Sequence, residues 1–359
     1  MRLPIALDYR PALLTRSGIG RATRELARGL AARADCELHL FGHSLARARV
    51  PAAIPRGATL HRAPWPGRSL PTLARLGLGA DRLAGRPRVF HWTDYVHAPL
   101  SRAKGVLTVH DLAFVRDPRW HGANAAVLRE RTAAAVAAAA AVIVPSHVTA
   151  TDLRMFAPAL RSVHVVPFGA DHVPVSPPPP KRLGRYLLTV GTIEPRKNLR
   201  PLLAALPLLA DAPQLVVVGQ VGWECDEIVA ELRAAQQAGR AVWRRDADDA
   251  ELWSLLAHAQ ALVFPSLWEG FGFPPLEAMA LGVPVVAHDN APMHELGDDA
   301  FVFADATDPR ALAAAIERVL HDREVRRLAI TAGRHRAADF AWDRCAAAHA
   351  AIYHEVAAC

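Results

Sequence analysis

The sequence predicts an α/β protein made of two doubly wound parallel sheets. Short runs rich in valine, isoleucine and leucine alternate with longer amphipathic runs, which is typical of strands joined by crossover helices. The alternation stops at a run of prolines near the middle of the chain and then starts again. With 359 residues, of which 52% are hydrophobic, the chain is long enough to bury two cores.

The first half contains six apolar runs of strand length with helical patterns between them. The strands are expected at 3–8, 36–42, 88–93, 105–111, 141–146 and 162–169, with clear helices at 19–34 and 124–140. Because parallel strands need long crossover connections, this spacing favours a parallel sheet. Residues 1–172 are therefore predicted to form one domain.

A stiff linker follows, because VPVSPPPPKRLG contains four consecutive prolines that cannot join a sheet. We place it at 173–183 and the second domain at 184–339. Strands are expected there at 185–191, 214–219, 241–245, 261–266, 283–289 and 300–304, with helices at 198–208, 224–236, 249–258 and 275–281. Two further helical stretches follow, and the last, 343–357, closes the chain.

The composition excludes several protein classes. The longest apolar run, residues 133–145, is shorter than the roughly 18 residues of a membrane span. Asp8 interrupts the first apolar stretch too early for a signal peptide. Four cysteines lie far apart without a CxxC pair, so neither a disulfide framework nor a zinc site is indicated. We therefore expect a soluble protein of the reducing cytoplasm.

The charge is unevenly distributed along the chain. Residues 1–172 contain 24 basic and 11 acidic side chains, a net charge of +13, whereas the remaining 18 basic and 24 acidic side chains give −6. A basic half suggests an anionic partner such as a membrane surface, a phosphorylated acceptor or nucleic acid. An arginine-rich compositional bias would produce the same count.

The segment PSLWEGFGFPPLEAMALGVPVV, residues 265–286, joins two predicted strands through a glycine-containing loop and a short helix. Pro274 and Pro275 suit the first positions of that helix and Gly282 suits its end, which places it at 275–281. Glycines at 270 and 272 let the backbone approach a ligand, and the amides at the helix start favour an anion or a hydroxyl-rich group.

Two glutamates accompany these glycines. Glu277, in the first turn, could be only a favourable charge near the positive end of the helix. Glu269 gains little from its place on the loop, so helix capping does not explain the pair. Carboxylates that hold sugar hydroxyls would account for both.

With seven residues between Glu269 and Glu277, this segment resembles the motif of the retaining glycosyltransferases of family four. These enzymes have the GT-B fold, in which two Rossmann-like domains face each other across a cleft. VGTIEPRKNLRPLLAAL, residues 190–206, resembles the donor-phosphate segment of the mannosyl- and rhamnosyltransferase-like branch. GIGRATREL, residues 18–26, and TVHDLAF, residues 108–114, resemble the family's N-terminal glycine loop and its histidine segment.

The resemblance implies a role for each of these motifs. Lys197 and Arg196, cations at the start of a helix, would hold the donor diphosphate. Thr192 stands where the family more often has arginine, so Arg196 would replace that charge. Glu277 would hold the ribose hydroxyls. The donor sugar would be held by Glu269 and by the backbone amides of Gly270, Phe271, Gly272 and Phe273.

In the first half, Gly18 and Gly20 would form a backbone cradle near the diphosphate, just before a helix. His110 would lie against the donor sugar. Asp111, Asp94 and His91 also stand at strand ends and are candidate acceptor contacts. In the family's fold the last helix, here 340–359, returns to complete the acceptor domain.

The expected reaction moves a hexose from a nucleotide-diphosphate sugar, with GDP-mannose the first choice and dTDP-rhamnose or a UDP-sugar next, to a saccharide or lipid-linked saccharide. The resemblance implies retention through front-face attack, in which the departing phosphate takes the acceptor's proton. No metal ion and no cofactor besides the donor are expected. The basic half suggests peripheral contact with an anionic membrane, and the sequence leaves the oligomeric state open.

Two other classes stay open. A sugar-nucleotide epimerase can share the two-domain fold. A nucleic-acid-binding protein would explain the basic half, but it would leave the paired glutamates and glycine loops without a purpose, and no recognition helix or aromatic-basic platform supports it. No nucleic-acid partner is therefore expected.

Overall fold

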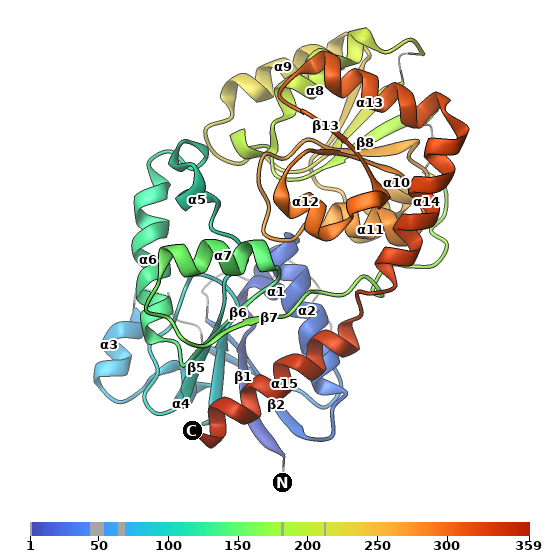
Figure 1. The fold of residues 1–359 in the computed structure, drawn as a ribbon. Helices are drawn as coiled ribbons and strands as arrows, with labels where there is room; N and C mark the ends of the chain where they lie inside the picture. The colour runs from blue at the N-terminus through green and yellow to red at the C-terminus, as the bar shows by residue number, and fades with distance from the viewer. Residues whose placement is uncertain (1, 44–53, 64–68, 181–182, 212) are drawn as a thin grey trace. The chain divides into compact units, whose positions relative to one another are not determined.

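The computed structural model describes residues 2–43, 54–63, 69–180, 183–211 and 213–359, which form two α/β units (Figure 1). The first unit consists of Met1–Val115, Ala126–Gly169 and Ala341–Cys359. The second consists of Arg116–Ala125 and Ala170–Phe340. The chain therefore contributes residues 116–125 to the second unit before it completes the first. It returns to the first unit for its last 19 residues, 341–359.

The first unit contains a seven-stranded parallel sheet in the order β3-β2-β1-β4-β5-β6-β7. One strand, β3, has no counterpart among the predicted strands, because histidine, arginine and threonine make up most of it. The strands are β1 (Leu3–Asp8), β2 (Cys36–His43), β3 (Thr59–Ala63), β4 (Val89–Trp92), β5 (Lys104–Thr108), β6 (Ala141–Val144) and β7 (Val163–Val165).

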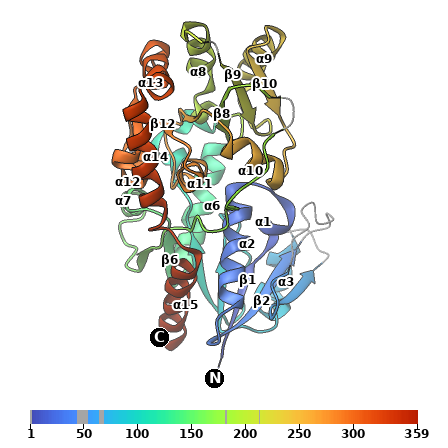
Figure 2. The same ribbon diagram turned by 90° about the vertical axis from the view of Figure 1, so that its right-hand side faces the viewer.

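Helices surround this sheet, and the last helix of the chain is one of them. Figure 2 shows it running beside α2, and Gly29 makes that approach close, since a Cβ there would lie 2.7 Å from Ala346 Cβ. Trp342, at its start, packs its ring 5.8 Å from that of Phe168. The helices are α1 (Arg10–Leu14), α2 (Gly18–Ala31), α3 (Leu70–Arg75), α4 (Ala80–Leu83), α5 (Ala113–Arg116), α6 (Asn124–Ala138), α7 (His147–Phe156) and α15 (Trp342–Ala358).

The second unit contains a six-stranded parallel sheet in the order β10-β9-β8-β11-β12-β13. In Figure 1, α8, α9 and α13 lie on one face and α10, α11, α12 and α14 on the other. The strands are β8 (Tyr186–Val190), β9 (Gln214–Val218), β10 (Ala241–Arg244), β11 (Ala261–Phe264), β12 (Val285–His288) and β13 (Phe301–Ala304). The helices are α8 (Leu199–Ala205), α9 (Asp226–Gln237), α10 (Asp249–Ala257), α11 (Phe273–Leu281), α12 (Ala291–Leu296), α13 (Pro309–His321) and α14 (Arg323–Ala337).

In each sheet, successive strands are added first on one side of the unit's first strand and then on the other, so the strand order reverses there. The reversal lies between β1 and β4 in the first unit and between β8 and β11 in the second. Central strands are covered on both faces, so Leu187, Val217 and Val263 are almost completely buried. Loops at the carboxyl ends diverge at such a reversal, which makes this the preferred place for a ligand.

The unit boundaries differ from 1–172 and 184–339 in two places. The second unit begins at Ala170, before the proline run, and it also contains residues 116–125. In that short segment His121 stacks on Trp223 with ring centroids 5.4 Å apart, and Trp223 donates a hydrogen bond to the carbonyl of Trp120 at 2.7 Å. These aromatic contacts join residues about a hundred positions apart, which no local pattern reveals.

Two helix starts also differ from the predicted ones. Helix α11 begins at Phe273 rather than Pro275, because Gly272 adopts a φ of 106° and turns the chain there. Glu277 consequently lies beyond the first turn. Helix α2 begins at Gly18, so the GIG stretch is helix rather than a preceding loop. Within the described ranges, no helix is long and apolar enough to cross a membrane.

Candidate functional site

The loops that follow β8 and β11 carry most of the predicted donor residues, and the structure brings them together. The amide of Leu267 donates to the carbonyl of Arg196 at 2.9 Å. The Asn198 side-chain amide donates to the carbonyls of Pro265 and Ala306 at 3.2 and 2.9 Å. Asn290, which caps α12, donates to the carbonyl of Ser266 at 3.0 Å. Side-chain amides thus fix both loops at the carboxyl edge of the sheet.

Glu269 lies between the two predicted cations. Its Oε1 is 2.5 Å from Lys197 Nζ, and its Oε2 is 2.9 Å from Arg196 Nη1. Arg196 also donates to Glu194 Oε1 at 2.7 Å and to the carbonyl of Trp268 at 2.5 Å. Arg196 is therefore buried among oxygen acceptors, whereas the Lys197 side chain keeps 20% of its surface exposed.

The charge state of Glu269 follows from this arrangement. Burial alone would raise its pKa, but the charges of Arg196 and Lys197, with hydrogen bonds from Lys197 and Ser266, lower the pKa to about 2. Glu269 is thus a carboxylate at neutral pH. The site holds an ionised acceptor beside a partly exposed ammonium group.

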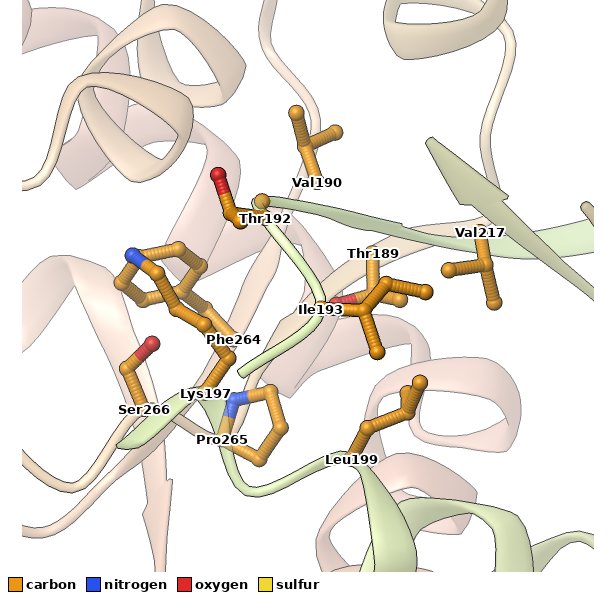
Figure 3. Close-up of a pocket in the computed structure, with 11 residues that line it drawn as sticks. Thr189, Val190, Thr192, Ile193, Lys197, Leu199, Val217, Phe264, Pro265 and Ser266 are labelled. Carbon is orange, nitrogen blue, oxygen red and sulfur yellow. The ribbon is translucent and has the colours of Figure 1, made fainter. Parts of the chain in front are cut away.

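A small hollow opens between the ends of β8 and β11 (Figure 3). Its walls include Gly191, Thr192, Lys197 and Ser266, and the Lys197 ammonium lies 5.5 Å from the centre of the Phe264 ring. A Cβ at position 191 would lie 3.3 Å from Lys197 Cε, so glycine there leaves the lysine its room. The hollow measures about 20 Å³, little more than one water molecule, and marks where these groups converge.

The glycine loop and the start of α11 form the neighbouring wall. Gly270, Phe271, Gly272 and Phe273 are all buried. The Phe271 ring packs edge-on against Phe273 at 5.5 Å and against Phe340 at 5.8 Å. This packing fixes the backbone amides at the start of the helix, where donors for a hydroxyl or an anion are expected.

Glu277 is 1% exposed, and its Oε1 lies 3.2 Å from His172 Nε2. His172 precedes the proline run, and its ring also packs edge-on against Trp253 and Phe273 at 5.5 and 6.3 Å. No local pattern in the sequence pointed to this histidine, because its partners lie 81 to 105 positions away. The contact places Glu277 in a defined orientation inside the unit.

In the first unit, His110 follows β5 and donates from Nε2 to the carbonyl of Thr93 at 2.8 Å. A carbonyl can only accept, so Nε2 carries the proton. Burial lowers the pKa of His110, although the Thr93 carbonyl, Asp111 and Asp94 oppose that shift. The neutral ring then offers the lone pair of Nδ1 as a hydrogen-bond acceptor.

The three predicted acceptor contacts have different surroundings. Asp94 follows β4, lies 2.5 Å from Arg10 and is partly exposed. The carboxylate of Asp111 accepts from the Ala113 amide at the start of α5. His91 is fully buried, and its ring nitrogens each lie 2.7 Å from a hydroxyl, that of Tyr353 or that of Thr108. His91 is a core residue, and we remove it from the candidate acceptor contacts.

Sequence reasoning missed Asp8, Arg10 and His43 at the same edge. Asp8, which ends β1, is fully buried and lies 3.3 Å from Arg10. Burial raises the pKa of Asp8 to about 6, against the opposing charge of Arg10 and with a smaller contribution from Asp94. His43, which ends β2, is buried, and neither ring nitrogen has a hydrogen-bond partner among the described residues. Burial and the Arg10 charge lower the pKa of His43 to about 4.

The glycines of GIG differ in their surroundings. Gly18 is exposed at the first position of α2. Gly20 is buried, and a Cβ there would lie 2.5 Å from the carbonyl oxygen of Thr15 and 2.9 Å from that of Pro11. Close packing against α1 therefore explains Gly20 without a ligand. Its predicted role near the diphosphate stays a prediction.

Among the residues that the structure describes, no group of three or more histidine, cysteine or acidic side chains is arranged to hold a metal ion. The site in the second unit combines cations, backbone amides and a few glutamate carboxylates. Such a set can bind an anionic group beside hydroxyls.

Comparisons with known proteins place both halves of the chain in glycosyltransferase families. Residues 178–336 match the family model described as glycosyl transferases group 1, and residues 16–173 match that described as glycosyltransferase family 4. The O-antigen chain mannosyltransferase B of Escherichia coli is 32% identical, with 92% of this chain and 93% of that protein covered.

Solved structures show the same fold. Sucrose-phosphate synthase from Thermosynechococcus elongatus superposes with a TM-score of 0.78 at 21% identity, covering 99% of this chain and all of that one. HepE from Anabaena, in complex with UDP and glucose, superposes with a TM-score of 0.75 at 17% identity over the same shares. The two parallel-stranded units thus form a GT-B fold, as predicted.

Proposed function

The chain belongs to the group 1, family 4 glycosyltransferases, and from this premise we propose that it transfers mannose from GDP-mannose to a saccharide or lipid-linked saccharide. The observation that carries the proposal is the convergence of Lys197 and Glu269 at the reversal of the second sheet, 2.5 Å apart. The choice of mannose is supported by the E. coli relative, which is a mannosyltransferase.

Lys197 is our candidate for the donor diphosphate. It is partly exposed and borders the hollow beside Gly191 and Thr192. As the bond between the anomeric carbon and the diphosphate breaks, negative charge grows on the leaving oxygen, and a fixed ammonium stabilises it. Arg196 is less suited to touch the donor, because carboxylates and a carbonyl already surround it.

Glu269 is proposed to accept hydrogen bonds from the donor sugar. Its lowered pKa keeps it ionised, so its oxygens act only as acceptors at neutral pH. Arg196 then has a positioning role: it compensates the buried carboxylate from one side and leaves Lys197 on the other for the phosphates. Amides from Gly270 to Phe273 would supply the donors that the carboxylate lacks.

Glu277 is proposed to hold the ribose hydroxyls, with His172 as the residue that orients it. His110 is proposed to accept a hydrogen bond at Nδ1 from a sugar hydroxyl, which its neutral state permits. Asp94 and Asp111 remain candidate acceptor contacts. Each assignment can be tested by substitution. Replacing a carboxylate by the corresponding amide, or His110 by asparagine, removes the proposed interaction with little change in side-chain size.

We propose retention of the anomeric configuration through front-face attack. The bond between the anomeric carbon and the diphosphate oxygen breaks while the acceptor oxygen bonds to the same carbon. The acceptor proton passes to the departing phosphate oxygen, so no protein nucleophile is needed. Positioning and electrostatic stabilisation would supply the acceleration, and the step as written requires no metal ion.

A donor panel tests the proposal. The protein is incubated with GDP-mannose, dTDP-rhamnose or UDP-glucose, with and without a mannose-terminated oligosaccharide, and the products are followed by mass spectrometry and by NMR of the anomeric carbon. We expect transfer from GDP-mannose to give an α-linked product, unchanged by EDTA. An isomerised nucleotide sugar without acceptor would identify an epimerase, and transfer only from another donor would overturn the choice of mannose.

A further inference from the structure

A large basic hollow lies in the first unit, at the amino ends of β4 and β5. It measures about 590 Å³, within the size range of ligand sites. Arg82, Arg86, Arg88, Arg102 and Lys104 line it. The candidate catalytic residue of this unit, His110, stands at the other end of these strands, and four residues of strand span roughly 13 Å. The hollow is therefore separate from the carboxyl edge.

The five cations of this hollow have no carboxylate within ion-pair distance among the described residues. The one acidic side chain in the lining, Asp81, is 2% exposed and accepts from the amides of Ser101, Arg102 and Ala103 at 2.8, 2.8 and 3.0 Å. Burial would raise the pKa of Asp81, but these amides outweigh it and lower the pKa. The lining therefore carries a net positive charge.

Backbone contacts hold the cations in place. Asp81 joins the segment that carries Arg82 to the one that carries Arg102, because it lies in the first turn of α4 and accepts hydrogen bonds from the amides before β5. The amide of Lys104 donates to the carbonyl of Arg88 at 3.0 Å, and Arg88 Nη2 donates to the carbonyl of Ala357 at 2.7 Å. The hollow is thus built by three segments that the sheet and α15 fix.

Two exposed leucines border the same surface. Leu76 is 73% exposed and Leu78 is 40% exposed. Gly77, between them, lies beside Arg82, since a Cβ there would be 4.0 Å from the Arg82 guanidinium. The Ser101 hydroxyl contacts the Gly77 carbonyl at 3.4 Å and accepts from the Gly79 amide at 2.9 Å. An apolar tip and a basic hollow are therefore adjacent.

We propose that this surface, formed by the five cations and Leu76 and Leu78, docks the protein on a membrane by binding the phosphates of anionic phospholipid headgroups. Arginine and lysine side chains match phosphate oxygens, and exposed leucines gain by entering the headgroup region. Among the described residues that line the hollow none is aromatic, so they offer no platform on which a nucleobase could stack. The surface belongs to the first unit and the donor loops belong to the second, so failure of this proposal would leave the proposed reaction untouched.

Vesicle binding tests the proposal. The full chain is sedimented with vesicles of phosphatidylcholine alone or mixed with phosphatidylglycerol, and we expect binding only to the mixture. Arg82→Glu/Arg102→Glu removes two cations, each worth about fivefold in affinity near an anionic surface, so we expect a loss of about 25-fold or more.

Arg131→Glu/Arg161→Glu is the matched control, because both arginines are exposed in the same unit outside the hollow and the charge change is identical. We expect a loss of less than about threefold for this control.

Further arms separate the alternatives. Leu76→Ser/Leu78→Ser should abolish the binding that persists at high salt, where electrostatic attraction is screened. Thermal melts and transfer to a soluble acceptor should stay at wild-type level in all three double variants. If the hollow variant and its control lost vesicle affinity equally, the loss would follow from net charge alone, and the proposal would be overturned. Tight binding of tripolyphosphate, abolished by Arg82→Glu/Arg102→Glu, without preference for anionic vesicles would assign the hollow to a soluble phosphate instead.

Discussion

The two sheets present different charge clusters at the same topological position. At the reversal between β8 and β11, Glu194 and Glu269 are matched by Arg196 and Lys197, so each carboxylate has a cation. At the reversal between β1 and β4, Asp8 and Asp94 share a single cation among the described residues, Arg10. The pKa of Glu269 accordingly falls to about 2, whereas burial holds that of Asp8 at about 6.

This difference separates two kinds of site. A balanced cluster keeps its charges fixed over the physiological range, which suits the binding of a diphosphate and the stabilisation of a leaving group. A cluster with a surplus carboxylate changes its protonation near neutrality and can offer either a donor or an acceptor to a hydroxyl. The comparison therefore predicts pH-insensitive donor binding in the second unit and pH-sensitive behaviour in the first.

The largest effect is expected from Lys197→Ala. If Lys197 stabilises the leaving diphosphate, kcat falls by about 100-fold or more, the usual cost of removing one preorganised charge from a transition state. Folding should change little, because Glu269 keeps Arg196. Arg200→Ala in α8 is the control, since Arg200 binds only exposed carboxylates. Wild-type turnover in Lys197→Ala would show that this lysine does not stabilise the leaving diphosphate. The functional role assigned to the balanced cluster of the second unit would then be wrong.

Glu269→Gln tests the balance of the same cluster. The substitution leaves the buried Arg196 and the partly exposed Lys197 beside a neutral amide, and breaking a buried pair costs about 3 kcal/mol in the free energy of unfolding. Because the folded pKa is depressed, the contribution of Glu269 is present above its unfolded value of about 4.5 and is lost as pH falls through about 2. The gap between wild type and variant in urea unfolding should shrink over that window.

Glu231→Gln is the control for this measurement, since Glu231 pairs with Arg200 at the surface. Its free energy of unfolding should stay within about 0.5 kcal/mol of wild type. A gap for Glu269→Gln that is equally small at pH 7 would mean that the lysine and the arginine do not depend on this carboxylate.

Asp8→Asn tests the surplus carboxylate of the first unit. Here the folded pKa is raised above the unfolded value, so the stabilising contribution is present below about pH 4 and is lost as pH rises through about 6. The free energy of unfolding of wild type should fall relative to that of the variant by about 2 kcal/mol between these limits. Parallel curves would show that Asp8 ionises normally and that the two clusters do not differ as described.

The sequence predicted the alternation of strands and helices well, because buried parallel strands are continuous apolar runs and proline marks where they cannot form. It failed where composition hides an element: β3 consists mostly of polar residues, yet it pairs with β2 from Thr59 to Ala63. The start of α11 was misplaced because two adjacent prolines both suit a first turn. The positive φ of Gly272 turns the chain before both prolines, so the helix begins at Phe273.

For the site, local motifs located the residues but not their partners. Lys197, Arg196 and Glu269 were each predicted to touch the donor, whereas the structure pairs them with one another across 72 and 73 positions. His172, Asp8 and His43 carried no signal, because an isolated acid or histidine at a strand end looks like any other. Long-range pairing across crossover helices is a property of the tertiary fold, and spacing along the chain does not record it.

The smallest effect on folding is expected from His43→Phe. Both ring nitrogens of His43 are buried without a hydrogen-bond partner among the described residues, so the folded protein already bears the cost of their desolvation. An apolar ring removes that cost while adding a little volume, and we expect the free energy of unfolding to stay within about 1 kcal/mol of wild type.

If the His43 nitrogens form hydrogen bonds with acceptor hydroxyls, the KM for the acceptor rises several-fold in His43→Phe while the KM for the donor is unchanged. His147→Phe, an exposed position at the start of α7, is the control. An unchanged acceptor KM in His43→Phe would show that this histidine only fills space. The neighbouring cluster of Asp8, Asp94 and Arg10 would then have no support from His43 as an acceptor site.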